Sequence, residues 1–217
     1  IVLWDVHRGE SLREYEEHES RAWSVDFCKP NPTIFASGSD DGRVKLWSTN
    51  VPDSVLTIEN HANVCSVRFN PVSVEKLAFG SAHHHVHYYD LRFPRQPLHV
   101  FQSHKKTVSY VKFASGTELV SACADSTIKL WNLETATLER TFSGHTNDRH
   151  FVGLSVNQDY IACGSEENAV YGYYKAIPKP FVQYRFASQD PLTGEDVQDD
   201  DETVFISSVC WCPRHPT

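Results

Sequence analysis

The feature that most constrains this chain is an internal repeat of about 42 residues. The same short segment recurs as LWDV, KLWS, HYYD, KLWN and GYYK, with aromatic anchors at Trp4, Trp47, Tyr89, Trp131 and Tyr173. The steps between these anchors are 43, 42, 42 and 42 residues. A second series, His18, His61, His104 and His145, advances by 43, 43 and 41 residues. Two independent markers with one period indicate a chain built by repeating one structural unit.

Each repeat contains four short runs of β-branched and aromatic residues. In the first complete repeat these are residues 22–27, 34–37, 44–47 and 55–58, separated by turn-forming Pro, Asn, Asp and Gly residues. Runs of this length and composition, bounded by turn residues, predict β-strands. The sequence therefore predicts an all-β chain with four strands per repeat. A single small sheet cannot bury both faces, so the repeats must stack on one another.

The repeating unit resembles the WD40 repeat, which has four strands, a His near its start and Trp-Asp near its end. That resemblance implies a fragment of a WD40 β-propeller, with four whole blades and two partial ones from a ring that typically has seven. The expected blades cover approximately residues 18–60, 61–103, 104–144 and 145–186. The partial blades cover 1–17 and 205–217, the latter with a strand over 205–211, and residues 187–204 form an acidic loop insertion.

The charge is concentrated in one segment. The formal net charge is −8 over 217 residues, yet residues 187–204 carry seven acidic side chains and no Lys or Arg, which leaves −1 for the rest. A nearly neutral body gives no field to attract nucleic acid. No apolar run of 18 residues is present, so no membrane-spanning segment is expected. The cysteines form no CxxC pair, which favours a reducing intracellular compartment. They are Cys28, Cys65, Cys123, Cys163, Cys210 and Cys212.

In WD40 repeats a His, a Ser or Thr, a turn Asp and the Trp indole share a buried hydrogen-bond network. Two sets match this pattern: His18, Ser37, Asp41 and Trp47, and His104, Ser121, Asp125 and Trp131. The other two repeats carry Phe79, His83 and Tyr89, and Cys163, Glu167 and Tyr173, so more apolar packing is expected there. The Ser, His and Asp of a set also resemble a hydrolase triad. No exposed oxyanion site accompanies them, so we interpret them as structural and predict no catalytic residue.

A run of histidines, His83, His84, His85 and His87, resembles a metal site. Alternate residues on a strand lie about 6.6 Å apart, too far for their nitrogens to meet one zinc ion at about 2 Å without a bend. The sequence favours a polar turn leading into a strand, and we predict no metal and no cofactor. Cys210 and Cys212 share a strand face without further ligands, and we interpret that spacing as incidental.

Loops that carry each repeat His into its first strand combine cations with large aromatic residues. On a propeller these loops gather on one face. They contain Arg21, Lys105, Lys106 and Arg149 together with Trp23 and Phe151. Such a mixture suits an acidic extended peptide with a hydrophobic anchor. The alternative is a solvated loop beside a core tryptophan.

Longer stretches resemble a narrower group, the C-terminal propeller of the constitutively photomorphogenic E3 ubiquitin ligase and its suppressor-of-phytochrome-A partners. They include HESRAWSVDF, SGSDDGRVKLW, HKKTVSYVKF and GHTNDRHFVGLSVNQDYIACGSE. KLAFGSA, YYKAIPKP and SQDPLTGEDVQDD are closer to the suppressor type, and HVHYYDLRFPRQPLHVF is closer to the ligase. The resemblance leaves the subtype open.

This resemblance implies a non-catalytic substrate receptor of a cullin/RING ubiquitin ligase complex, located in the nucleus and also in the cytoplasm. Its ligands would be motifs of light-signalling transcription factors and photoreceptors in which acidic residues precede Val-Pro. The family's peptide site maps onto Arg21, Trp23, Lys106 and Phe151. Arg21 and Lys106 would pair with carboxylates, while the two aromatic residues border the Val-Pro pocket. A family ligase or suppressor protein is an implied partner. The alternative function is a scaffold that assembles signalling complexes without delivering substrate.

Residues 89–92 (YDLR) resemble the Asp-x-Arg box by which some WD40 proteins dock the adaptor of cullin-based ligases. Tyr89 replaces the usual Trp. Asp90 and Arg92 lie two apart, on one side of a strand, so they can also pair with each other. The sequence thus leaves adaptor docking and a structural ion pair as two interpretations.

Overall fold

The computed structural model describes residues 1–186, 188–189, 196–197 and 204–212. Every regular element in these ranges is a β-strand. Among the described residues, no helix is long and apolar enough to cross a bilayer. Most of the acidic stretch predicted as an insertion, residues 187–204, lies outside the described residues. Its described parts include a two-stranded pair, β19 (Ser188–Gln189) and β20 (Asp196–Val197).

Four antiparallel sheets of four strands follow one another along the chain. The first contains β3 (Ala22–Phe27), β4 (Ile34–Ser39), β5 (Arg43–Ser48) and β6 (Ser54–Glu59). The second contains β7 (Val64–Phe69), β8 (Lys76–Ser81), β9 (His85–Asp90) and β10 (His99–Gln102). The third contains β11 (Val108–Phe113), β12 (Glu118–Cys123), β13 (Thr127–Asn132) and β14 (Thr137–Ser143). The fourth contains β15 (Leu154–Val156), β16 (Tyr160–Cys163), β17 (Ala169–Tyr174) and β18 (Val182–Arg185).

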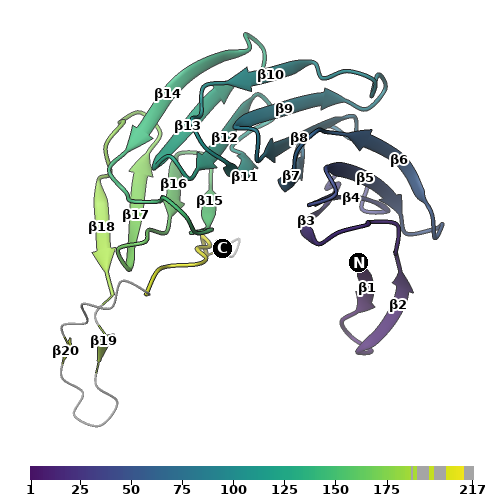
Figure 1. Cartoon of the computed structure of the whole chain (residues 1–217), viewed down its shortest axis with the longest axis horizontal. Helices are drawn as coiled ribbons and strands as arrows, with labels where there is room; N and C mark the ends of the chain where they lie inside the picture. The colour runs from purple at the N-terminus through teal and green to yellow at the C-terminus, as the bar shows by residue number, and fades with distance from the viewer. Residues whose placement is uncertain (187, 190–195, 198–203, 213–217) are drawn as a thin grey trace, which may run out of the picture.

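The sheets are arranged as an arc (Figure 1). β3, β7, β11 and β15 lie on its inner side and β6, β10, β14 and β18 on its outer side, so each sheet runs in chain order from the inside outwards. This arrangement confirms the predicted all-β WD40 propeller fragment. A hairpin of β1 (Val2–Asp5) and β2 (Glu10–Glu14) lies at the N-terminal end of the arc.

The C-terminal segment 204–212 runs beside the fourth sheet. The Trp211 N–H donates to Ser155 Oγ at 3.0 Å, and the Ile206 N–H donates to the Ser165 carbonyl at 3.1 Å. The strand expected over residues 205–211 is not formed, which corrects the prediction. The physical reason is that a strand is defined by its ladder, and no described strand pairs with this segment.

The core lies between neighbouring sheets. Val44, Ile58, Val67 and Phe79 belong to one buried cluster that joins the first two sheets. Val67 is 0% exposed, whereas Val25, at the matching position of the first sheet, is 41% exposed. The two residues have equal chemistry, so the difference comes from the sheet packed in front of Val67. Burial of each face therefore depends on the next sheet.

The first complete hydrogen-bond network links His18, Ser37, Asp41 and Trp47. Trp47 Nε1 donates to Ser37 Oγ at 2.8 Å, and the same hydroxyl lies 2.6 Å from His18 Nε2. His18 Nδ1 lies 2.7 Å from Asp41 Oδ2. If Nδ1 carries the proton, the indole, hydroxyl, imidazole and carboxylate form one chain in which every donor has an acceptor.

The second network has the same order in the third sheet. Trp131 Nε1 donates to Ser121 Oγ at 2.8 Å, and His104 Nε2 lies 2.7 Å from that hydroxyl. His104 Nδ1 lies 3.4 Å from Asp125 Oδ2. Burial raises the pKa of Asp125, but hydrogen bonds from His104, Thr127 and the Lys105 N–H outweigh it and hold the pKa well below its usual range. Asp125 is therefore held as a carboxylate that fastens the loop start to the turn.

The second sheet replaces this network with stacked rings. Phe79 stacks on His87 at 4.7 Å and on Tyr89 at 5.7 Å between ring centroids. His61 is exposed and takes no part, because it lies six residues before Val67 whereas His18 lies seven before Val25. Asn60 takes that place and donates to Ser81 Oγ at 3.0 Å. The nearly equal spacing of the four histidines therefore did not reveal that His61 lies one residue closer to its inner strand than His18 does.

The fourth sheet keeps part of a polar network. His145 Nδ1 lies 2.9 Å from the Tyr173 hydroxyl, which reaches the imidazole from the position of the Trp. Burial lowers the pKa of His145 to about 4. His145 is therefore neutral near pH 7, and this sheet is less purely apolar than the sequence predicted.

The two kinds of turn predict different responses to mutation. Asp125→Ala removes the acceptor of His104, Thr127 and the Lys105 N–H, and it should cost about 1–3 kcal/mol of unfolding free energy. His83→Ala, in the exposed turn of the second sheet, should cost much less. Chemical denaturation of both variants measures the difference, and equal losses would contradict the network.

A second prediction concerns Glu17, which joins the first hairpin to the first sheet. Its carboxylate accepts from Lys45 Nζ at 2.8 Å and from the Ser54 N–H at 2.6 Å. The hydrogen bond from Lys45 is the largest influence that lowers the pKa of Glu17 from 4.5 to about 2. A lowered pKa stabilises the fold above the unfolded value, so this contribution is complete above about pH 4.5 and is lost as pH falls towards 2.

The measurement is the unfolding free energy of the wild type minus that of Glu17→Gln, followed against pH. The difference should be largest near pH 6 and shrink below pH 4.5. Glu16→Gln, an exposed neighbour, is the matched control and should show no such trend. Identical pH profiles for the two variants would show that the Lys45 contact does not stabilise the fold.

Candidate functional site

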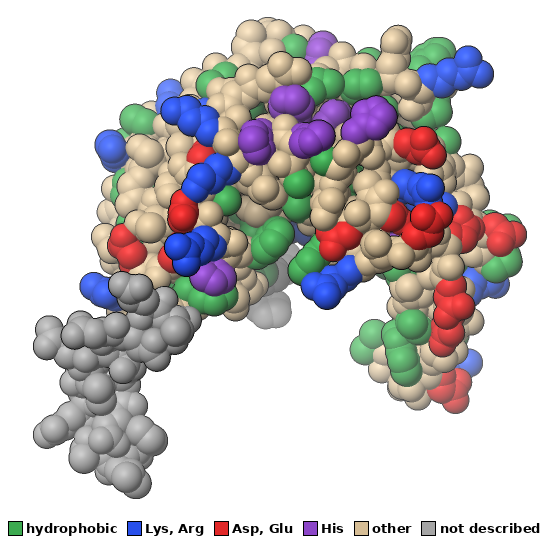
Figure 2. All heavy atoms as spheres, viewed as in Figure 1, with side chains coloured by type: hydrophobic (Ala, Val, Ile, Leu, Met, Phe, Trp, Pro, Cys, Tyr) green, Lys and Arg blue, Asp and Glu red, His purple; other side chains and the backbone are tan. Residues whose placement is uncertain are grey.

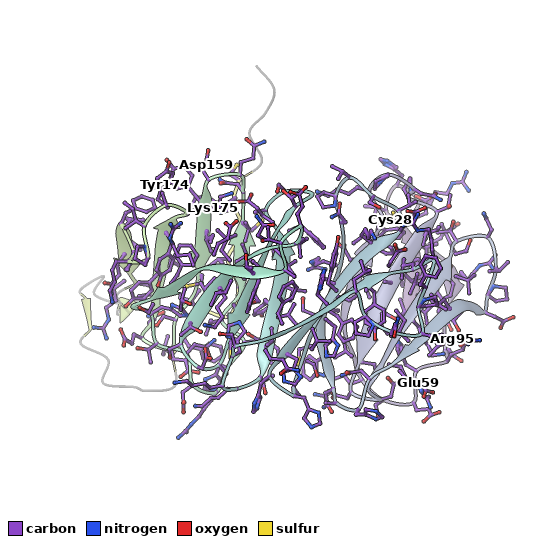
Figure 3. All side chains as sticks on the ribbon, turned by 90° about the horizontal axis from the view of Figure 1, so that it is seen from above. Cys28, Glu59, Arg95, Asp159, Tyr174 and Lys175 are labelled. Atoms are coloured by element: carbon purple, nitrogen blue, oxygen red, sulfur yellow. The ribbon has the colours of Figure 1, made fainter. Side chains whose placement is uncertain are left out.

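The candidate site lies on the rim where each outer strand passes into the inner strand of the next sheet. Figure 3 shows Asp159 and Lys175 on one rim and Glu59 towards the other. Glu59 ends β6, directly before the loop to β7. The loops before β7, β11 and β15 therefore gather on the rim opposite Asp159. The loop before β3, which contains Arg21, opens on the same side.

Two aromatic residues from opposite ends of the arc meet at this rim. Trp23, from β3, and Phe151, from the loop before β15, stack with ring centroids 5.6 Å apart and an angle of 15° between planes. The Arg21 guanidinium lies 5.1 Å from the Trp23 ring centroid, a cation–π geometry. Tyr110 contacts Phe151 edge to face at 5.8 Å. Three of the four residues predicted for peptide binding are thus in one cluster.

Phe151 reaches this position because its loop is longer than the others. His145 lies nine residues before Leu154, which pairs with Cys163 as Val25 pairs with Ser37. The corresponding distance from His18 to Val25 is seven residues. The two additional residues let the loop extend inwards. Glu166 holds it there, because one carboxylate oxygen accepts the N–H groups of Arg149 and His150, both at 2.7 Å.

Lys106, the fourth predicted residue, is already paired within the chain. Its ammonium donates to Asp148 Oδ1, in the same long loop that carries Phe151. The hydrogen bond from Lys106 is the main cause that holds the pKa of Asp148 below its usual range. Arg149 Nε lies 3.9 Å from the other oxygen of Asp148. A ligand carboxylate that uses Lys106 must therefore compete with Asp148.

Sequence reasoning missed Tyr110, Asp148 and Glu166. Tyr110 sits in a strand and gave no signal beyond its apolar character. Asp148 and Glu166 are separated by 18 positions and act through a loop contact that no spacing rule describes. Only the extra length of the loop before β15 could have indicated that it reaches further than the others.

The Asp-x-Arg box forms an ion pair within the chain. Arg92 Nε donates to Asp90 Oδ1 at 2.9 Å, and Arg92 Nη2 donates to Asp90 Oδ2 at 2.6 Å. Lys76 Nζ also donates to Asp90 Oδ2 at 2.6 Å. The hydrogen bond from Arg92 is the largest cause that keeps the pKa of Asp90 well below its usual range. The structural interpretation of the box therefore has direct geometric support, while adaptor docking stays a prediction.

The alternative catalytic and metal interpretations gain no support from the described residues. Ser121 is fully buried and hydrogen-bonded to Trp131, so its hydroxyl is not available to a substrate. His104, Cys123 and Asp125 lie close together, but Cys123 Sγ donates to the Lys106 carbonyl at 3.2 Å and the other two belong to the network above. The ring centroids of His85 and His87 are 6.2 Å apart. Figure 2 shows several histidine side chains gathered over the middle of the arc.

The chain is similar to several characterised proteins. It is 52% identical to E3 ubiquitin-protein ligase COP1 of Arabidopsis thaliana over 217 residues, which covers 100% of this chain and 32% of the relative. It is 49% identical to Protein SPA1-RELATED 4 of Arabidopsis thaliana, over 97% of this chain and 27% of the relative. WD repeat-containing protein RUP2 of the same plant is 36% identical, over 97% of this chain and 59% of the relative.

A family model described as "Nucleolar protein 10-like, N-terminal domain", a β-propeller, matches residues 4–179. The chain belongs to this β-propeller family, as a WD40 domain of the COP1 and SPA type. The chain spans 32% of the length of the COP1 relative. The similar identities to COP1 and to SPA1-RELATED 4 do not separate the two subtypes.

The Asp-x-Arg pair gives a prediction that separates its two interpretations. Asp90→Ala removes the acceptor of Lys76 and two hydrogen bonds of Arg92, which keeps Glu75 Oε2 at 3.2 Å, and should cost about 1–3 kcal/mol of unfolding free energy. Arg92→Ala should cost less, because the Arg92 side chain is 55% exposed and Asp90 keeps Lys76. Urea denaturation measures both, with Arg95→Ala as an exposed control on the following loop. If Arg92→Ala leaves stability unchanged yet abolishes binding to a cullin-ligase adaptor, docking is its main role.

Proposed function

We propose that this WD40 domain is a non-catalytic substrate receptor of a ubiquitin ligase complex. Its ligand is an extended peptide in which acidic residues precede a Val-Pro pair. Arg21 and Lys106 bind the carboxylates, and Trp23 and Phe151 supply the apolar surface for Val-Pro. Transfer of ubiquitin belongs to other parts of the complex.

The observation that carries this proposal is the meeting of Trp23 and Phe151 at the rim. They come from β3 and from the loop before β15, 128 positions apart, and they remain partly exposed despite stacking on each other. An exposed pair of aromatic rings beside cations is the composition expected of a peptide anchor site. A core tryptophan, the alternative interpretation, would be buried as Trp47 is.

The charges around this pair suit an acidic ligand. Arg21 already lies over one face of Trp23 and can receive a carboxylate without leaving the ring. Lys106 is about half exposed and can exchange Asp148 for a ligand carboxylate. Arg149 then remains beside Asp148 and compensates its charge. The exchange conserves the number of ion pairs, so its cost is small.

The relatives support the ubiquitin-ligase context. COP1 is named an E3 ubiquitin-protein ligase, and the proteins of the SPA type include Protein SUPPRESSOR OF PHYA-105 1. From this similarity we extend to the present chain a family ligase or suppressor partner, a cullin-ligase adaptor, and ligands among light-signalling transcription factors and photoreceptors. The second candidate function is a scaffold that assembles such complexes without delivering substrate. The Asp148–Lys106 pair favours it, because a rim that satisfies its own charges needs no acidic ligand.

The test is calorimetric titration of a synthetic peptide carrying two acidic residues before Val-Pro. Lys106→Glu replaces attraction by repulsion and should weaken binding at least about tenfold, or about 1.4 kcal/mol. Arg95→Glu makes the same charge change on an exposed residue of the β9–β10 loop and should leave the affinity unchanged.

Trp23→Ala distinguishes apolar from ionic contributions. It should also weaken binding, yet it should leave the dependence on salt nearly unchanged, because it removes contact area rather than charge. Raising the salt concentration should weaken the wild-type complex, since half-exposed ion pairs are screened. Unchanged affinity for both Lys106→Glu and Trp23→Ala would exclude the peptide site and leave the scaffold function.

A further inference from the structure

The inner strands of the arc leave backbone N–H groups that face away from their own sheets. In antiparallel pairs alternate residues point their N–H groups away from the partner strand, and an inner strand has no partner on its other side. The preceding sheet supplies acceptors for several of them. Ser24 Oγ accepts the Val67 N–H at 3.1 Å, and Asp26 Oδ2 accepts the Phe69 N–H at 2.8 Å. At the far end of the arc Ser155 Oγ accepts the Trp211 N–H at 3.0 Å.

The residue at the position of Asp26 differs from sheet to sheet. In the first sheet Asp26 directly follows Val25, the residue that pairs with Ser37. The strand register places three residues at the same position in the second, third and fourth sheets: Arg68, Lys112 and Ser155. Asp26 and Ser155 can accept a hydrogen bond, whereas Arg68 and Lys112 can only donate. Accordingly, the inward N–H groups of Phe113 and Val156 have no acceptor among the described residues.

Arg68 and Lys112, the two cations at the position of Asp26, also have N–H donors without a hydrogen-bond acceptor among the described residues. Arg68 turns back towards the first sheet, where Nη1 donates to the carbonyls of Val25 and Val67, both at 3.1 Å, and lies 3.4 Å from Asp26. Its Nε is buried and has no hydrogen-bond partner. Lys112 is partly buried and forms no hydrogen bond or ion pair with any described residue. Burial first, and then the nearby charge of Arg68, lowers the pKa of Lys112.

We propose that the inner wall between β7 and β11 binds a small monoanion of carboxylate type. Arg68, Lys112 and the Phe113 N–H hold it in the place that the Asp26 carboxylate takes one sheet earlier. There, one carboxylate accepts the Phe69 N–H and faces Arg68 of the next sheet. One sheet later the matching donors are the Phe113 N–H and Lys112, and no residue that the structure describes supplies a carboxylate to that N–H.

The charge balance supports an anion at this place. Burial and the cations Arg68 and Lys29 disfavour the charged form of Lys112, whereas Asp26 and the Cys210 thiol favour it. Partly buried cations on neighbouring inner strands repel each other more strongly than in water, and a bound anion reduces that repulsion. A small anion fits better than a peptide segment, because the repeat leaves out a single side-chain carboxylate and no more.

The first experiment measures the melting temperature of the intact protein in sodium acetate against sodium gluconate at equal ionic strength. Gluconate is too large to replace one side-chain carboxylate. Acetate should raise the melting temperature by about 3–6 °C once its concentration exceeds the dissociation constant about tenfold. Lys112→Met should abolish this increment, whereas Lys179→Met, which removes the same charge from an exposed loop, should retain it.

An absent increment, or an equal one in both variants, overturns the proposal. A second measurement does not depend on variants that may differ in stability. Crystals of the wild-type protein soaked in bromide should show an anomalous peak within hydrogen-bond distance of Lys112 Nζ and the Phe113 nitrogen. Peaks confined to other parts of the surface overturn the site. Neither experiment uses the acidic peptide, so their outcome is independent of the function proposed above.

Discussion

Packing of one sheet on the next is the interaction on which the rest of this structure depends. Strands of about six residues form sheets that are apolar on both faces, and neither face can be buried within one sheet. Val67 and Val25 show this directly, because the same side chain is fully buried with a sheet in front of it and 41% exposed without one. The radial order of inner and outer strands, and hence the position of every loop, follows from this requirement.

The buried polar networks fix the starts of the loops rather than the sheets themselves. In the first and third sheets the Trp indole, Ser hydroxyl, imidazole and carboxylate form one continuous chain. The second sheet forms the same architecture with stacked rings around Phe79. The network is therefore one way to hold the turn beside the loop, and apolar stacking is another. Where the network exists, it holds Lys105 and hence its neighbour Lys106 at the rim.

Both inner strands and loops contribute residues to the rim. The inner strands carry Trp23 and Tyr110, and the loop before β3 carries Arg21. One longer loop brings Phe151 and Asp148 to them. The loop carries both an apolar surface for a ligand and the carboxylate that occupies Lys106. Affinity for an acidic peptide would then reflect exchange between two carboxylates, one internal and one external, rather than occupation of a free cation.

Sequence by itself determined the repeat, the four strands per unit and the residue types of both networks, because these follow from local periodicity and from a family pattern. It also predicted Arg21, Trp23, Lys106 and Phe151 as peptide-binding residues, from their positions in the loops and from the family resemblance. Tertiary structure alone decided that Asn60 takes the place expected for His61, that Asp148 pairs with Lys106, and that the Phe113 N–H finds no acceptor in the described part of the chain. These depend on register and on contacts between sheets. Such contacts join positions 21 or more residues apart, and no local pattern in the chain encodes their geometry.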